Sequence, residues 1–180
     1  MQEYPRGGFA NGEVLNEGLE HLPCVILLDT SGSMAGCIDE LNDALAMFKA
    51  DLESDVNARA KVEACLIAFD DSAHIVAPFS AVRNLATPVL SAGGLTALHE
   101  AIDVAIEEID ARRKQYKSLG TISYKPFIFL MTDGYPSDDY KAGLAALQTC
   151  ICTSMPGHET GLTISLFDMP RFRGRGSQRV

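Results

Sequence analysis

Three short runs of apolar residues constrain the fold most strongly. They occupy residues 24–29, 62–70 and 125–133, and each is mostly apolar rather than alternating between apolar and polar positions. This pattern is typical of strands covered on both faces, as in a parallel sheet flanked by helices. Because parallel neighbours need long crossover connections, the segments between these runs are expected to supply helices.

The intervening segments have the spacing of amphipathic helices. In residues 34–55 and again in residues 97–116, apolar side chains recur every three or four positions. Residues 137–150 are a third candidate, because Ser137 is a good N-cap and acidic residues follow it in the first turn. Strands and helices therefore alternate along the chain.

Two further segments complete the predicted sheet. Residues 73–79 follow the second apolar run after a short turn, which permits only an antiparallel neighbour, and Pro78 favours an edge position. Residues 162–167 are a candidate fifth strand. The sequence thus predicts an α/β fold with a mostly parallel central sheet, one antiparallel edge strand and helices on both faces.

Composition narrows the function classes. The formal net charge is −9, which argues against binding to nucleic acid or to an anionic membrane surface. No apolar run approaches the roughly 18 residues of a membrane span, and residues 1–18 have no apolar core, so we do not expect them to be a signal peptide. The five cysteines show no disulfide framework, and Cys24 and Cys65 lie in apolar runs. We therefore expect a cytoplasmic protein.

Three regions are predicted along the chain. Residues 1–22 are rich in Gly and Asn and form an irregular arm, and residues 23–168 form the folded domain. Residues 169–180 contain four arginines and no acidic residue, unlike the acidic body, which predicts a disordered basic tail.

Oxygen-bearing side chains follow the carboxyl ends of the predicted central strands. In an open α/β sheet, ligands bind at this edge. The first strand ends in a D-x-S-x-S pattern, the 125–133 strand ends in T-D-G, and a glycine-rich loop at residues 91–96 opens the second helix. The side chains that should converge there are Asp29, Ser31, Ser33, Thr96 and Asp133.

This set suits a hard divalent cation. Mg²⁺ takes oxygen ligands in an octahedron and usually keeps some waters. Two carboxylates roughly neutralise a divalent ion, and hydroxyls add no charge. If one Asp acts through a water, the metal stays electron-poor on its open side and would favour an anionic oxygen from a partner. Taken alone, D-x-S-x-S is equally explained as a capped turn in which Ser33 serves a helix N-terminus.

In this order, the three motifs resemble the von Willebrand factor type A (VWA) domain with its metal-ion-dependent adhesion site. The resemblance covers about residues 20–150 and implies a Rossmann-like fold. It implies hydroxyl ligation by Ser31, Ser33 and Thr96, with Asp29 and Asp133 bound directly or through water. It also implies a non-catalytic protein-binding module that uses Mg²⁺, or Mn²⁺ or Ca²⁺ in its place, to accept an Asp or Glu carboxylate from a partner.

A narrower resemblance links the chain to bacterial stand-alone members of the TerY type. It rests on LPCVILLDTSGSMAG, SAGGLTAL and MTDGYPSDD. It implies a role in tellurite-resistance and stress-response complexes, some of which contain protein kinases and phosphatases. The family sheet normally has a last helix and edge strand that residues 150–180 do not match, so we expect this pair to be missing.

Several residues near the motifs have two interpretations. Met34, Leu95 and Tyr135 are either rim contacts for a partner or plain loop side chains. Asp70 and Asp71 are interpreted as solvated turn acids. A metal role is disfavoured for His99, which lies beside an all-oxygen set, and for three residues whose spacing is wrong for a zinc site, namely Cys150, Cys152 and His158.

Two other function classes remain as alternatives. A haloacid-dehalogenase-like phosphoryl-transfer hydrolase also places an Asp at the end of its first strand near Mg²⁺. It needs a second acid two residues later to protonate the leaving group, and that position is Ser31 here. A structural scaffold with a vestigial metal site is the other alternative.

Overall fold

The computed structural model describes residue 6, residues 20–133 and residues 163–168. Predictions that fall on the remaining residues lie outside this range. They concern the helix at 137–150, the disfavoured zinc ligands, Tyr135, most of the N-terminal arm and the tail at 169–180. The expected absence of the family's last helix and strand also falls on these residues.

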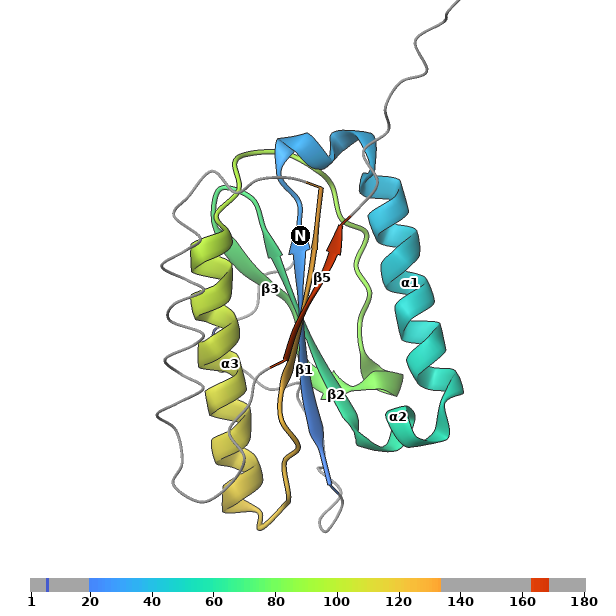
Figure 1. Ribbon diagram of the computed structural model, residues 1–180, viewed down its shortest axis with the longest axis vertical. Coiled ribbons are helices and arrows are strands. Elements are labelled where there is room, and N and C mark those ends of the chain that lie inside the picture. The colour runs from blue at the N-terminus through green and yellow to red at the C-terminus, as the bar shows by residue number, and fades with distance from the viewer. Residues whose placement is uncertain (1–5, 7–19, 134–162, 169–180) are drawn as a thin grey trace, which may run out of the picture.

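The described chain is built on a five-stranded sheet in the order β3-β2-β1-β4-β5 (Figure 1). Neighbouring strands are parallel except for the β2–β3 pair, which is antiparallel. The predicted α/β fold class is therefore confirmed, with β3 as the antiparallel edge strand. The strands are β1 (Leu22–Asp29), β2 (Val62–Phe69), β3 (Ala73–Ala81), β4 (Phe127–Thr132) and β5 (Thr163–Asp168).

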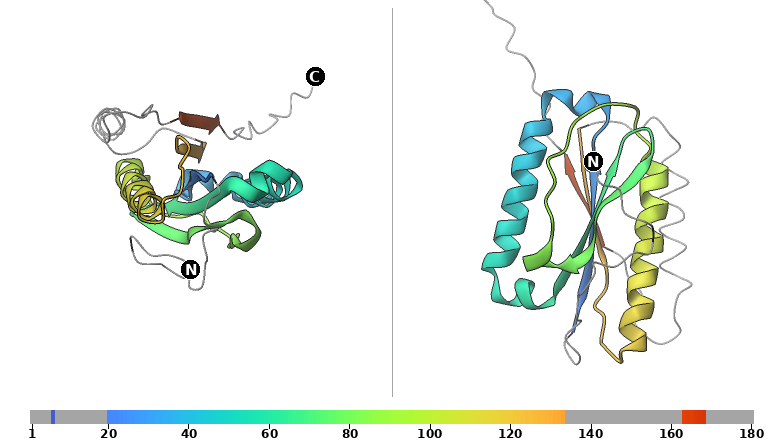
Figure 2. Two further views of the ribbon diagram at one scale, coloured as in Figure 1. Left: turned by 90° about the horizontal axis from the view of Figure 1, so that it is seen from below. Right: turned by 180° about the vertical axis from the view of Figure 1, so that it is seen from behind.

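Helices cover both faces of the sheet (Figures 1 and 2). The long helices α1 (Ile38–Ser54) and α3 (Leu98–Ser118) lie on opposite faces, and the short α2 (Val56–Lys61) leads from α1 into β2. Two short 3₁₀ segments, η1 (Gly32–Gly36) and η2 (Val82–Asn84), follow β1 and β3. None of the helices in the described residues is long and apolar enough to cross a membrane.

Strand β1 shows why the apolar runs are continuous. Its side chains alternate between two hydrophobic clusters, and both faces are buried. Ile26 and Leu28 pack in the cluster on the α1 side, and Val25 and Leu27 pack in the cluster on the α3 side. Cys24 and Cys65 are buried free thiols, as expected.

The edge strand β3 accommodates its proline through irregular pairing. The register with β2 shifts between Ala64 and Leu66 and again between Leu66 and Ile67, so β3 carries extra residues around Pro78. Because proline has no N–H to donate, an edge position next to a bulge leaves the sheet intact.

The first predicted helix starts later than its periodicity suggested. Residues 34–55 were expected to be helical throughout, but α1 begins at Ile38 and η1 comes before it. The tighter η1 turn lies directly after β1, at the carboxyl edge of the sheet. Register aligns this edge across strands, since Asp29 pairs with Phe69 of β2 and Leu28 pairs with Met131 of β4.

Candidate metal centre

Asp29 is the anchor of the candidate site. It is the last residue of β1, and only 1% of its surface is exposed. One carboxylate oxygen accepts the backbone N–H of Ser31 at 2.9 Å, and the other accepts the hydroxyl of Thr132 at 2.5 Å. Within the described part of the chain, no ion pair joins Asp29 to a basic side chain. Its carboxylate is thus oriented by two donors, and neither neutralises its charge.

The two serines connect Asp29 to Asp133. The Ser31 and Ser33 hydroxyls share a hydrogen bond of 3.0 Å, and the Ser33 hydroxyl donates to Asp133 Oδ1 at 2.9 Å. Asp133 directly follows β4, and 8% of its surface is exposed. The capped-turn interpretation does not hold, because Cys37 is the N-cap of α1 and the Ser33 hydroxyl is directed to Asp133.

The glycine-rich loop at residues 91–96 is bonded to the turn after β1. Gly93 N donates to the carbonyl of Thr30 at 2.8 Å, and Gly32 N donates to the carbonyl of Gly94 at 3.0 Å. The approach is close, since a Cβ on Gly32 would lie 3.2 Å from that carbonyl oxygen. Thr96 lies two residues farther along this loop. The structure therefore brings together the three segments that the sequence predicted.

The electrostatic potential around the site is negative. Burial raises the pKa of the Cys37 thiol, and the negative charges of Asp133, Glu40 and Asp29 raise it further. Taking a carboxylate out of water costs free energy unless a cation or several donors compensate. A cation is one species that could provide this compensation at the site.

The donor set fits a small hard cation. Adjacent oxygens of a magnesium octahedron lie about 2.9 Å apart, given metal–oxygen distances of about 2.0–2.1 Å. The Ser31–Ser33 and Ser33–Asp133 oxygen pairs have separations of 3.0 and 2.9 Å. No group of three or more His, Cys, Asp or Glu suited to a metal occurs in the described residues, so hydroxyls are essential to the set. His99 instead pairs with Asp103 at 3.2 Å.

The structure corrects the predicted rim. Met34 is not a rim contact, because its side chain is completely buried in the cluster on the α1 side, with its sulfur 3.6 Å from that of Cys37. Met34 lies in the η1 turn, where its side chain points into the core. Leu95 does fit a rim position, since 67% of its surface is exposed. Tyr135 lies outside the described residues.

Two contributors were missed from the sequence. Thr132 was noted only as part of T-D-G, yet its hydroxyl holds the Asp29 carboxylate. Asp71 was interpreted as a solvated turn acid, but it accepts the backbone N–H of Leu95 at 2.9 Å. A polar residue at the end of a buried strand was a usable signal for Thr132. No local spacing marked Asp71.

Comparisons with known proteins identify the family of the fold. Residues 24–136 match the family model described as the von Willebrand factor type A domain. No protein in a search of curated sequences matches.

Solved structures share the fold at low sequence identity. The PilB minor pilin from Streptococcus sanguinis has a TM-score of 0.50 and 18% identity over 63% of this chain and 30% of the pilin. BatB from Bacteroides thetaiotaomicron has a TM-score of 0.51 and 18% identity over 82% of this chain and 66% of BatB. An aerotolerance-related membrane protein from Bacteroides fragilis has a TM-score of 0.51 and 16% identity over 88% of this chain and 77% of that protein. The chain thus spans less than a third of the pilin that it matches.

Proposed function

Because the chain belongs to the von Willebrand factor type A domain family, a family of protein-interaction modules, we propose that it binds a protein partner through a divalent cation. The observation that carries this proposal is Asp29, a carboxylate with 1% exposure and no basic partner in the described residues. A cation bound next to it would provide the compensation that the protein itself does not supply.

Each side chain has a distinct role in this proposal. Asp29 and Asp133 provide the negative charge, and Ser31, Ser33 and Thr96 provide neutral oxygens. Thr132 orients the Asp29 carboxylate by donating a hydrogen bond to it. Mg²⁺ is the favoured ion, with Mn²⁺ or Ca²⁺ as substitutes. The bound ion would supply an open position for an Asp or Glu carboxylate of the partner.

The cellular context is also a proposal. The resemblance to TerY-type proteins supports a cytoplasmic partner from a bacterial stress-response or tellurite-resistance complex that contains a kinase or phosphatase. The basis is the resemblance of the three sequence motifs that carry the candidate ligands.

The hydrolase alternative is less well supported by the geometry. A general acid is needed two residues after Asp29, and that position holds Ser31, whose hydroxyl bonds to Ser33. Turnover of a generic phosphate ester by the purified protein with Mg²⁺, lost in Asp29→Ala, would favour this alternative over the binding module.

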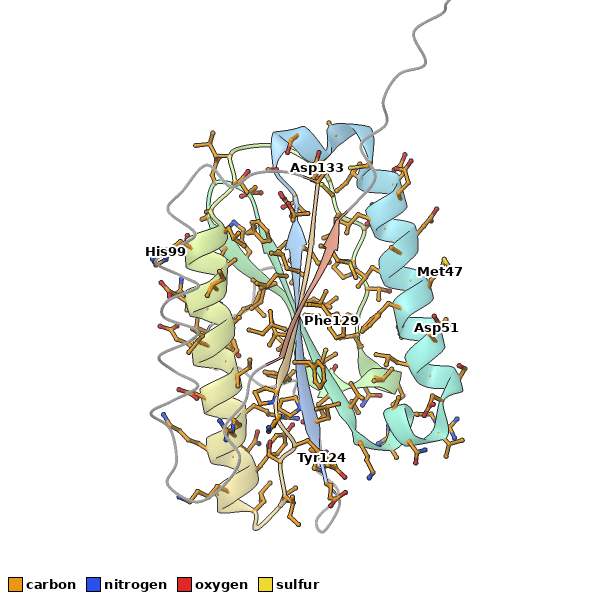
Figure 3. The ribbon with its side chains drawn as sticks, viewed as in Figure 1. Met47, Asp51, His99, Tyr124, Phe129 and Asp133 are labelled. Atoms are coloured by element: carbon orange, nitrogen blue, oxygen red, sulfur yellow. The ribbon has the colours of Figure 1, made fainter. Side chains whose placement is uncertain are left out.

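The deciding experiment is partner capture in Mg²⁺ and in EDTA. We expect a set of cell proteins that binds only with Mg²⁺ and that Asp29→Ala does not capture. Asp51→Ala is the matched control, because it removes an exposed acid from α1, away from the site (Figure 3). Equal capture by wild type in EDTA, or by Asp29→Ala in Mg²⁺, would refute the proposal. Absence of any Mg²⁺ or Mn²⁺ binding by titration calorimetry would instead indicate a vestigial site.

A further inference from the structure

Asp71 forms a connection that the proposed metal ligands do not explain. It lies in the turn between β2 and β3, and its side chain is exposed to solvent. An exposed aspartate usually interacts with water. Here the carboxylate reaches across to the glycine-rich loop and accepts the Leu95 backbone N–H at 2.9 Å.

The loop is shaped to receive this carboxylate. Gly94 has φ of +74°, a conformation that favours glycine, and a Cβ at this position would lie 2.9 Å from Asp71 Cγ. Any side chain at Gly94 would therefore displace the carboxylate. The neighbouring Gly93 has open space around its Cβ position, so the requirement is specific to Gly94.

The same turn holds the loop at a second point. Ala97 N donates to the backbone carbonyl of Asp70 at 2.8 Å. Thr96 lies between the two anchored amides of Leu95 and Ala97. On its other side the loop is bonded to the D-x-S-x-S turn through Gly93 and Gly94. The loop is thus fixed between the β2–β3 turn and the turn after β1.

We propose that Asp71 is a positioning residue of the metal centre, which holds the glycine-rich loop so that Thr96 faces the cation and Leu95 stays exposed at the rim. The expected change in Mg²⁺ affinity rests on the proposed function. A hydrogen-bond partner outside the ligand set typically changes metal affinity by about 10–100-fold. Asp71 acts through the loop backbone and is not itself a ligand.

Two substitutions separate the hydrogen bond from the charge. Asp71→Ala removes the acceptor, so we expect Mg²⁺ affinity in titration calorimetry to fall about tenfold or more. Asp71→Asn keeps an oxygen that can accept the Leu95 N–H, so its affinity should stay within about threefold of wild type. Wild-type affinity in Asp71→Ala, or equal loss in both variants, would overturn the proposal.

Asp55→Ala is the matched control for a structural effect. Asp55 caps α2 by accepting the backbone N–H groups of Asn57 and Ala58 at 2.8 and 2.9 Å, on a helix that packs at the other end of α1 (Figure 1). Its loss should lower the melting temperature without changing Mg²⁺ affinity. If Asp55→Ala weakened Mg²⁺ binding as much as Asp71→Ala, the effect would be general destabilisation and the positioning role would be refuted.

A metal-free measurement distinguishes this inference from the proposed function. In protein treated with EDTA, the Leu95 amide should exchange with deuterium at least about tenfold faster in Asp71→Ala than in wild type, because its acceptor is gone. Asp71→Asn should restore slow exchange. Unchanged Leu95 exchange in Asp71→Ala refutes the role of Asp71. Failure of wild type to bind Mg²⁺, with the exchange result as expected, refutes the metal function alone.

Discussion

Two buried carboxylates at opposite ends of the sheet have opposite surroundings. Asp29 ends β1 at the carboxyl edge, and Glu63 lies near the start of β2 at the other edge. Their exposed fractions are 1% and 3%, so burial does not distinguish them. The charges around the two carboxylates distinguish them.

Glu63 is neutralised from within the protein. The Arg112 Nε donates to it at 2.7 Å, the Tyr116 hydroxyl donates to the same carboxylate oxygen, and His21 Nδ1 lies 3.3 Å from the other. His21 also stacks on Tyr116 with ring centroids 5.3 Å apart. Burial opposes the charge on Arg112, but the hydrogen bond to Glu63 raises the pKa of the guanidinium, which keeps Arg112 charged.

The contrast separates an acid that is paired within the protein from an acid that we propose binds a cation. Glu63 has its counterion built into α3, so it needs nothing from solution. Asp29 has only neutral donors among the described residues, so under the proposed function a bound cation would neutralise it. The difference between them can be tested by removing partners at each end in turn.

The largest expected effect comes from Arg112→Met. It would leave the Glu63 carboxylate buried without its cation, which costs about 3–5 kcal/mol of unfolding free energy. Urea unfolding measures this, and the double variant with Glu63→Gln should recover part of the loss. A loss below about 1 kcal/mol would show that Glu63 is not neutralised by Arg112.

Asp29→Asn should have its main effect on binding instead. Loss of the anchoring charge is expected to weaken Mg²⁺ affinity at least about 100-fold, or about 2.7 kcal/mol. Unfolding free energy in EDTA should change by less than about 1 kcal/mol, because no counterion loses its partner. Severe destabilisation in EDTA would remove the distinction between the two acids.

The residues around Glu63 should also contribute to the loss of folding stability at alkaline pH. Burial and the nearby Glu63 carboxylate raise the pKa of Tyr116 above its usual value near 10. Above pH 10 the unfolded chain loses this proton and the folded chain retains it, so stability is complete below pH 10 and falls at higher pH. The slope from this group is about 1.4 kcal/mol per pH unit. Unfolding curves for Tyr116→Phe should lack this contribution, and equal slopes in both proteins would contradict it.

The smallest effect concerns the loop at the Asp29 end. Gly94→Ala should cost about 1 kcal/mol or slightly more, because alanine must adopt a positive φ against the Asp71 carboxylate. Gly93→Ala, one residue away with open space, is the control and should be nearly neutral. Thermal unfolding of both variants in EDTA compares them, and equal melting temperatures would show that the loop can adjust.

The fold was largely predictable because burial on both faces leaves a simple pattern. Continuous apolar runs predicted β1, β2 and β4, and the short turn before residues 73–79 predicted the antiparallel edge. Side-chain direction was less predictable. Met34 was interpreted either as a rim contact or as a plain loop side chain. Its side chain is instead buried, in a 3₁₀ turn that replaces the first turn of the expected helix.

Pairings between distant residues were not predictable from spacing. Glu63 and Arg112 are 49 residues apart, and Asp71 and Leu95 are 24 residues apart, so neither pair leaves a local signature. The candidate metal ligands could be grouped because one sheet edge gathers the ends of several strands, a rule that relates sequence position to space. The anchors of its loops follow no comparable rule.

The Ser33–Asp133 hydrogen bond joins residues 100 positions apart, and this separation has a kinetic consequence. The site can form only after β1 and β4 have paired, so an early folding intermediate would have no complete cation site. Cation binding should therefore leave the folding rate almost unchanged and slow unfolding instead. A bound ion would then slow unfolding, and its removal would shorten the lifetime of the folded state.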